Sequence, residues 1–190
     1  MVLEEKISAV EALFKSLDAA INQFQTQTSL HCKWGCGKCC YKPDIEATIL
    51  EFLPFALHLY RENKIDDWYA RMNGTESPTC QILNPTSLGA GLCSEYIHRG
   101  LICRLFGYSA RTNKYSKKEL VTCSIIKTEQ ATAFQKAEKE IDQNPAVPVM
   151  SNYYMQLHAI DGELSREFYP INEAIKKAIE RVLHHFSYGR

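Results

Sequence analysis

Eight cysteines are the residues of this sequence best suited to chemistry, because thiolates bind soft metal ions and take part in redox reactions. They all lie in the middle of the chain, and none lies beyond residue 123; they are Cys32, Cys36, Cys39, Cys40, Cys80, Cys93, Cys103 and Cys123. In a reducing compartment, clustered thiols are metal ligands or redox groups more often than disulfides. The cysteine pattern therefore predicts a metal centre.

The first half of this centre is predicted in residues 32–40, which hold four cysteines separated by glycines. Glycine allows the tight backbone that turns thiolates two or three residues apart onto one ion. Cys39 and Cys40 are adjacent, and adjacent side chains diverge, so we do not expect both to bind one ion symmetrically. The spacing Cys32-x3-Cys36-x2-Cys39 also fits the radical-SAM cluster motif, but the barrel of alternating strands and helices that such enzymes need is not predicted here.

The second half is predicted from the four remaining cysteines, which are Cys80, Cys93, Cys103 and Cys123. Eight thiols can build two four-ligand sites, or one site with some cysteines left over. Four thiolates around a divalent ion leave a net negative charge, and Arg99 and Arg104 stand close to candidate ligands in the sequence. We expect these two arginines either to donate hydrogen bonds to bound sulfurs or to form ordinary surface ion pairs.

These motifs together resemble the YkgJ-type cysteine-cluster family, the CxxCxxCC domain that is described as zinc- or iron-chelating. Residues 36–40 match the end of the family's opening motif C-x-x-C-G-x-C-C, residues 80–83 its middle cysteine, and residues 93–96 its C-S-x-Y motif. Residues 99–106 match R-P-x-x-C-R-x-F, and Cys123 matches the final cysteine. The resemblance covers residues 32–123 and implies metal chelation by the cysteines. In this chain the first cysteine, Cys32, stands three residues before Cys36 rather than two, and Gly100 replaces the usual proline.

An enzyme related to flagellin lysine-N-methylase, a protein with a related cysteine segment, is an alternative. Such an enzyme needs a site for S-adenosylmethionine, and the glycine-rich run 89–91 is the candidate. No strand is predicted before it, so we expect a flexible loop instead.

His31 and His98 lie near cysteines in the sequence, but a lone histidine beside cysteines is more often a hydrogen-bonded side chain or a metal ligand than a catalytic base. We expect His58 and His158 to be structural.

Zinc and an iron–sulfur cluster both accept four cysteines, so ligand identity does not separate them. A site whose coordination positions are all filled by cysteine favours a structural or electron-transfer role over catalysis. A spare thiolate such as Cys32 or Cys40 would instead allow redox chemistry. The sequence therefore predicts a zinc- or iron-binding protein, with a redox protein or a metal-dependent enzyme as alternatives, and no catalytic residues are recognised.

Helices are expected to hold the cysteine segment in place. Between residues 3 and 24, apolar side chains recur at alternating spacings of four and three; they are Leu3, Ile7, Val10, Phe14, Leu17, Ile21 and Phe24. This heptad seam predicts a long amphipathic helix in residues 1–28. The seam either packs on the rest of the chain, which we favour, or joins two copies in a homodimer.

The remaining helices are predicted from apolar periodicity and from start and stop residues. We expect one after Pro43-Asp44 that runs to Arg61 and is kinked or split by Pro54. Others are expected at 65–72 before Asn73-Gly74, at 128–142, and from Pro170 onward. Residues 149–160 are predicted as helix or extended chain, and residues 75–100 as loop. The last helix has an apolar face made of Ile171, Ile175, Ala178, Ile179, Val182, Leu183 and Phe186.

No convincing alternating strand pattern is present, so the sequence predicts an all-α fold. We expect one irregular helical domain over residues 1–190, with a cysteine-cluster segment at 29–125 and C-terminal helices at 126–190. The metal-binding segment is predicted to be loop, with 75–100 folding over the centre.

Composition and charge exclude several classes of partner. Lys and Arg together number 22, as do Asp and Glu, so no basic excess is available to neutralise nucleic-acid phosphates. The chain has no apolar run long enough to span a membrane. Its acidic start lacks the apolar segment of a signal peptide, so we expect a cytoplasmic protein whose thiols stay reduced.

Overall fold

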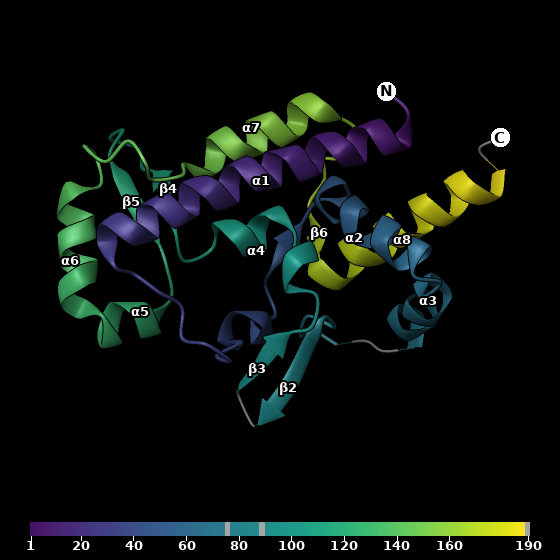
Figure 1. Cartoon of the computed structure of the whole chain (residues 1–190), viewed down its shortest axis with the longest axis horizontal. Coiled ribbons are helices and arrows are strands. Elements are labelled where there is room, and N and C mark those ends of the chain that lie inside the picture. Colours follow the sequence, from purple (N-terminus) through teal and green to yellow (C-terminus); the bar gives the residue numbers. More distant parts are fainter. Residues whose placement is uncertain (75–76, 88–89, 189–190) are drawn as a thin grey trace. The chain divides into compact units, whose positions relative to one another are not determined.

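The structure is a computed structural model that describes residues 1–74, 77–87 and 90–188. Within these residues the chain is mostly helical, and its six short strands pair in three separate antiparallel sheets (Figure 1). The pairs are β1 (Glu46–Ala47) with β6 (Tyr169–Pro170), β2 (Leu83–Ser87) with β3 (Ala90–Cys93), and β4 (Ser109–Thr112) with β5 (Lys118–Val121). The all-α prediction is therefore right about the dominant element and wrong in omitting these strands, which have two to five residues and are too short to show a clear alternating pattern.

Eight α-helices and two 3₁₀ helices make up the rest of the regular structure in the described residues. They are α1 (Leu3–Thr28), η1 (Lys38–Tyr41), α2 (Ile49–Arg61), α3 (Ile65–Gly74), η2 (Tyr96–His98), α4 (Leu101–Leu105), α5 (Ser124–Glu129), α6 (Ala131–Glu140), α7 (Met150–Ile160) and α8 (Ile171–Tyr188). The predicted N-terminal helix is confirmed as α1, and all seven residues of its heptad seam are buried.

The chain forms two compact units, each assembled from segments that are distant in the sequence. The first unit comprises Met1–Glu11, Gly35–Gly100 and Leu157–Arg190. The second comprises Ala12–Trp34 and Leu101–Gln156. Helices α1 and α7 contribute residues to both.

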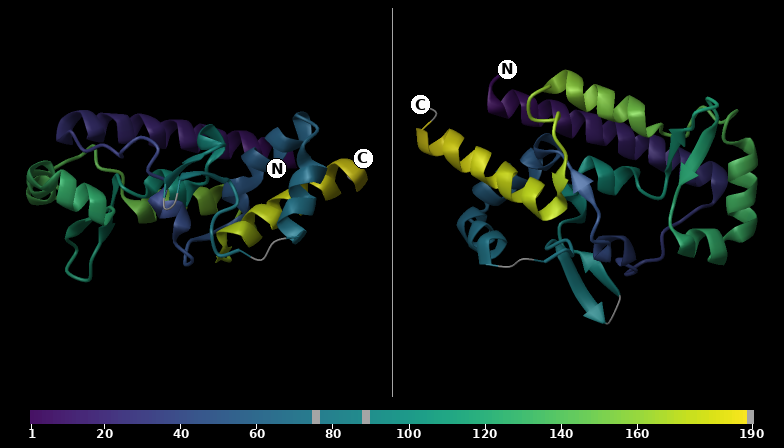
Figure 2. Two further views of the ribbon diagram at one scale, coloured as in Figure 1. Left: turned by 90° about the horizontal axis from the view of Figure 1, so that it is seen from below. Right: turned by 180° about the vertical axis from the view of Figure 1, so that it is seen from behind.

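The core of the first unit is helix α2, which packs with α3 and α8 (Figure 2). Nine of the thirteen residues of α2 are buried, as expected for a helix composed mainly of apolar residues. Helix α8 faces it with five of the predicted apolar residues, while Leu183 and Phe186 are partly exposed; the five are Ile171, Ile175, Ala178, Ile179 and Val182. The amphipathic pattern of the sequence thus located this core correctly.

Helix α2 begins later than predicted, at Ile49 rather than just after Pro43-Asp44. The buried carboxylate of Glu51 accepts hydrogen bonds from the backbone N–H and the hydroxyl of Thr48, at 2.7 and 3.1 Å, and so caps the helix start. The residues before it, 46–47, are paired with 169–170. Pro54 does not split the helix, because its surroundings are buried on all sides.

The predicted loop at 75–100 is wrong over most of its described length. It contains the β2–β3 hairpin and the 3₁₀ helix η2. Pro85 and Gly91 are poor strand formers, and the ladder has a register shift between Pro85 and Ser87, so the period of a strand is hidden in the sequence. Residues 75–76 and 88–89 lie outside the described part of the chain.

The second unit is built around the β4–β5 hairpin and helices α5 and α6. Backbone N–H groups of Lys118 and Leu120 on β5 donate to carboxylates of Asp142 and Glu138, at 2.8 and 3.1 Å, so residues 138–142 cover this strand. Its buried side chains include Leu101, Leu105, Tyr108, Ala110, Leu120 and Ile126. Residues 150–160 prove to be a helix, α7, one of the two predicted alternatives.

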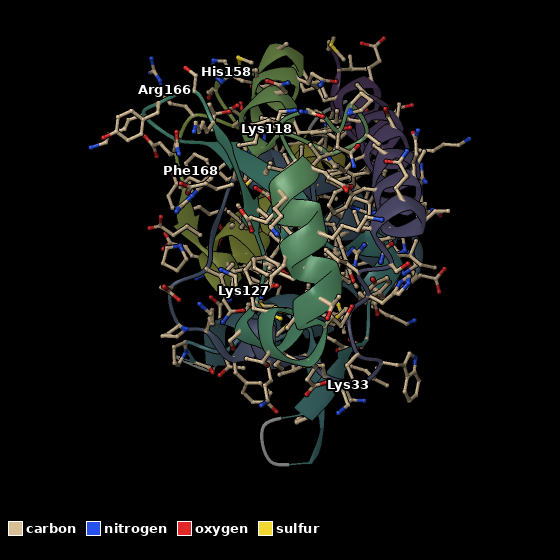
Figure 3. All side chains as sticks on the ribbon, turned by 90° about the vertical axis from the view of Figure 1, so that its left-hand side faces the viewer. Lys33, Lys118, Lys127, His158, Arg166 and Phe168 are labelled. Atoms are coloured by element: carbon tan, nitrogen blue, oxygen red, sulfur yellow. The ribbon has the colours of Figure 1, made fainter. Side chains whose placement is uncertain are left out.

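The predicted helix at 128–142 is two helices, α5 and α6, separated at Gln130. The side-chain amide of Gln130 donates to the His31 carbonyl at 2.6 Å and accepts from the His31 N–H at 2.9 Å. Lys127 of α5, labelled in Figure 3, places its ammonium 5.3 Å from the ring centre of Phe134 on α6. Tertiary contacts of this kind fix the break, and they are not visible in helix propensity.

None of the helices within residues 1–74, 77–87 and 90–188 has the length and apolar character needed to cross a lipid bilayer.

Candidate metal centre

Backbone hydrogen bonds bring three cysteine-bearing segments of the first unit together. The Cys80 N–H donates to the Cys40 carbonyl at 3.1 Å, and the Gly91 N–H donates to the Gly35 carbonyl at 3.2 Å. Strand β3, which ends at Cys93, pairs with β2, which begins three residues after Cys80. The loop 35–41, the turn at 80–82 and the hairpin are therefore joined, and with them five of the eight cysteines.

Two glycines shape the loop that carries Cys36, Cys39 and Cys40. Gly35 and Gly37 have φ angles of 71° and 56°, in the left-handed region that side chains disfavour. A Cβ atom on Gly37 would lie only 2.6 Å from the carbonyl oxygen of Gly91. The expectation that glycine makes the tight cysteine loop possible is confirmed.

Cys39 and Cys40 lie on the 3₁₀ helix η1, with their sulfurs 3.9 Å apart. Two thiolates on one tetrahedral ion, each about 2.3 Å from the metal, have sulfurs roughly 3.8 Å apart. We expected adjacent side chains to point apart. On this 3₁₀ turn the two sulfurs instead lie close together, and their spacing suits a common ion.

The Cys39 thiol is exposed and acidic. A hydrogen bond from the Cys40 thiol, helped by backbone N–H groups and by the positive charge of Arg99, lowers the pKa of Cys39 to about 6. Cys39 is therefore a thiolate at neutral pH, which is the form that binds metals and attacks electrophiles.

Cys80 and Cys93 behave in the opposite way. Burial, together with the negative charges of Cys93 and Cys39, raises the pKa of Cys80 to about 11. Burial also raises the pKa of Cys93, with Glu95 and Cys39 acting in the same direction and Arg99 opposing them. The charges of Cys39, Cys80 and Cys93 thus act on one another, although within the described residues the group of ligand atoms lying within 4.8 Å of one another is His58, Glu95 and His98 and not these three sulfurs. A cation bound among them would favour all three thiolates at once.

The two arginines have different surroundings. The Arg99 guanidinium lies 3.9 Å from the ring centre of Tyr96 and lowers the pKa of both Cys39 and Cys93, which supports its predicted role beside the thiolates. Arg104 is buried in the second unit, where it pairs with the Asp18 carboxylate and lies 4.5 Å from the ring centre of Phe14. For Arg104, a role beside sulfur stays a prediction.

Three of the predicted ligands belong to the second unit. Cys32 is exposed, and its backbone N–H donates to the Tyr108 hydroxyl. Cys103 lies on the short helix α4, and Cys123 precedes the first turn of α5 as its N-cap. The part of these three cysteines in metal binding remains a prediction.

Close packing against helix α2 explains why a glycine stands at position 100. A Cβ atom there would lie 2.8 Å from the Phe52 ring and 2.9 Å from the Glu51 carboxylate, both on helix α2. A proline at this position would collide with the same atoms.

The glycine run considered as a cofactor loop, 89–91, ends in strand β3, where Gly91 packs against Gly37. Gly89 lies outside the described residues.

One group of potential ligands was not anticipated from the sequence. His58, expected to be structural, lies beside Glu95 and His98, and their ligand atoms are all within 4.8 Å of one another. His58 is far from the other two along the chain, so no spacing motif signals the group. His158, by contrast, has a structural partner as expected, because its ring is 3.0 Å from the Ser165 hydroxyl.

Comparison with known proteins addresses the cysteine segment directly. Residues 31–124, about half of the chain, match the CxxCxxCC family, described as "Putative zinc- or iron-chelating domain". All eight cysteines fall inside the matched region. Neither a curated protein nor a solved structure matches the chain. Through residues 31–124, this chain belongs to the CxxCxxCC family, as its motifs predicted.

Proposed function

We propose that the chain binds zinc or iron through the thiolates of Cys39, Cys40, Cys80 and Cys93. The observation that carries this proposal is the 3.9 Å between the sulfurs of Cys39 and Cys40, which is the spacing of two thiolates on one tetrahedral ion. We assign Cys80 and Cys93 as the further donors, because hydrogen bonds tie their segments to the same loop and because their charges act on one another. Within the described residues no three of these sulfurs lie within 4.8 Å of one another, so binding requires the side chains to turn toward the ion.

The pKa values of three of the four thiols determine which protons a bound cation must displace. Cys39 is a thiolate at neutral pH, so it provides the first ligand without losing a further proton. Cys80 and Cys93 hold their protons more tightly because they are buried, and binding must displace those protons. Four thiolates around a divalent ion carry a net charge of about −2, which Arg99 partly offsets.

The donor set fits both a single zinc ion and an iron–sulfur cluster, since each is held by four cysteines. In both cases the four cysteines occupy every position that the protein can ligate, which favours a structural or electron-transfer role over hydrolysis. Cys36, in the same loop, is a fifth thiol that stays outside this set. Cys32, Cys103 and Cys123, which belong to the second unit, also stay outside this set.

A thiol redox role is the second candidate, and one observation favours it. Cys39 is both exposed and a thiolate at neutral pH, which are the properties of a cysteine that reacts with oxidants. In that case the protein would be folded without metal, and Cys39 would be the first thiol modified.

The test is the metal content of variants purified without oxygen. Elemental analysis and absorption spectra should show that Cys39→Ser and Cys93→Ser lose the metal of the unmodified chain, while Cys32→Ser, at an exposed thiol of the second unit, retains it. Brown protein with iron and sulfide identifies a cluster, and colourless protein with zinc identifies a structural ion. Full metal content in Cys39→Ser and Cys93→Ser, or a folded unmodified chain without metal, would overturn the proposal.

A further inference from the structure

A second set of ligand atoms lies in the first unit and contains no sulfur. Nε2 of His58 is 3.9 Å from Oε2 of Glu95, and the His58 and His98 rings stack with centres 4.0 Å apart at an interplanar angle of 17°. One nitrogen from each ring and one Glu95 oxygen all lie within 4.8 Å of one another. All three residues are half-buried, so they are partly shielded yet open to solvent.

The backbone explains why these three side chains converge. Glu95 immediately precedes the 3₁₀ helix η2, and the His98 N–H donates to the Glu95 carbonyl at 2.9 Å. In a 3₁₀ turn, residues three apart lie on the same side, so Glu95 and His98 face one direction together. Helix α2 packs against η2 and supplies His58 from its last turn.

Two imidazoles and one carboxylate are a ligand set for divalent first-row metal ions. Such sets hold zinc in hydrolytic sites and iron(II) in non-haem sites, and in both they leave coordination positions for water or another small molecule. This differs from a four-thiolate site, which leaves none. An imidazole lone pair lies in the ring plane, so binding requires the stacked rings to turn about Cβ–Cγ, a soft rotation.

We propose that His58, Glu95 and His98 form a second, open metal site that takes a divalent ion such as Zn²⁺ or Fe²⁺. The proposal does not depend on the thiolate centre, because none of its donors is a cysteine. At such a site, a water molecule bound to the metal can exchange with another small molecule. An ordinary ion pair between His58 and Glu95 beside two stacked rings is the competing explanation, and it predicts no response to metal.

The direct test follows imidazole nitrogens by NMR while Zn²⁺ is added to the full chain, purified anaerobically with its own metal content unchanged. Ring signals of His58 and His98 should shift together and saturate, whereas those of His184, exposed on α8, should not. Unchanged His58 and His98 signals at saturating Zn²⁺ would overturn the proposal. This readout uses the unmodified chain, so it does not depend on whether a variant folds.

Variants give a second, independent readout. Glu95→Gln keeps the shape of the side chain but removes its charge, and it should weaken Zn²⁺ binding at this site by about tenfold or more. His184→Ala is the matched control and should leave binding unchanged. Equal Zn²⁺ affinity in Glu95→Gln and the unmodified chain would contradict a role for this carboxylate.

The failure of this proposal can be told apart from the failure of the thiolate proposal. In Cys39→Ser, a lost thiolate metal with His58 and His98 still responding to Zn²⁺ supports two separate sites. Conversely, if His98→Ala releases the metal bound by the cysteines, the histidines belong to that centre and the separate site is overturned.

Discussion

The sulfurs of Cys39 and Cys40 lie 3.9 Å apart on a single 3₁₀ turn, and the Cys40 thiol lowers the pKa of Cys39. Cys40 stabilises the thiolate of Cys39 by hydrogen bonding and is the main cause that lowers the pKa of Cys39 to about 6. A cation bound to both sulfurs would displace the proton of the hydrogen bond between them.

Replacing Cys40 with serine should raise the pKa of Cys39. The Cβ–O bond of serine is shorter than the Cβ–S bond of cysteine, so the hydroxyl does not take the position of the Cys40 sulfur and the hydrogen bond that lowers the pKa is disturbed. Cys40→Ala removes this hydrogen bond altogether. The rate of Cys39 alkylation in metal-free protein, measured against pH, should show a midpoint near 6 in the unmodified chain and a higher one in both variants. Cys32→Ser is the control, and an unmoved midpoint in Cys40→Ala would contradict the assignment.

Neutralising Arg99 should weaken metal binding. Its positive charge lowers the pKa of Cys39 and Cys93, so Arg99→Gln raises both and increases competition from protons. We expect a loss of roughly tenfold in metal affinity at neutral pH, measured by competition with a chelator. Arg99→Lys keeps the charge and should retain more of the affinity. Equal loss in both variants would mean that shape, rather than charge, is what Arg99 contributes.

Adding a single carbon at Gly100 should destabilise the first unit. The new Cβ would meet the Phe52 ring at 2.8 Å and the Glu51 carboxylate at 2.9 Å, and both belong to the buried helix α2. Overpacking of this kind costs about 1–3 kcal/mol of unfolding free energy, to be measured by urea denaturation of Gly100→Ala. Gly74→Ala is the matched control, because nothing lies within 4 Å of its added carbon. Equal stability of Gly100→Ala and Gly74→Ala would contradict the close packing.

The ion pair between Lys6 and Asp161, at 2.5 Å, should make stability depend on pH. Burial alone would raise the pKa of Asp161, but the Lys6 ammonium and the N–H groups of Leu164 and Glu163 outweigh it and hold the pKa below its usual 3.8. The contribution of Asp161 is therefore complete above the unfolded pKa and disappears as pH falls through the lower folded one.

Asp161→Asn tests this dependence. It should cost about 1–3 kcal/mol at pH 7, and the difference from the unmodified chain should shrink in acid, where both carry an uncharged side chain. Urea unfolding at a series of pH values measures it. A constant difference across that range would show that the charge of Asp161 contributes nothing.

The heptad seam of α1 leads to a prediction about assembly. All seven seam side chains are buried within the chain, so little apolar seam remains to join two copies. We expect a monomer, with a mass near 21.7 kDa by light scattering after gel filtration. Twice that mass would favour the homodimer that a heptad pattern also allows.

The helices that bury one face were predictable, because a 3.6-residue period marks the side that packs. Helix α1 follows this rule at every predicted position, and α8 follows it at five of its seven. The start of α2 was predicted wrongly from Pro43-Asp44, because the helix begins behind a capping box formed by Thr48 and Glu51. The β2–β3 hairpin was not predictable, because it contains Pro85 and Gly91 and is stabilised by contact with the loop at Gly35 and Gly37.

The candidate centre was predictable in its residue types and not in its geometry. Cysteine spacing marks all eight cysteines as candidate donors. It does not predict that the sulfurs of Cys39 and Cys40 lie side by side, because this depends on side-chain rotation in a short 3₁₀ turn. The group of His58, Glu95 and His98 forms only when α2 packs against η2. Such convergence is a tertiary property, and a single sequence carries no sign of it.

X-ray absorption at the metal edge tests the central claim most directly. The edge of anaerobically purified chain carrying one metal centre identifies the element, and the extended fine structure counts the atoms around it. We predict a first shell of four sulfurs at about 2.3 Å, reduced in Cys93→Ser. A first shell of nitrogen and oxygen alone, at about 2.0–2.1 Å, would contradict thiolate binding by these cysteines.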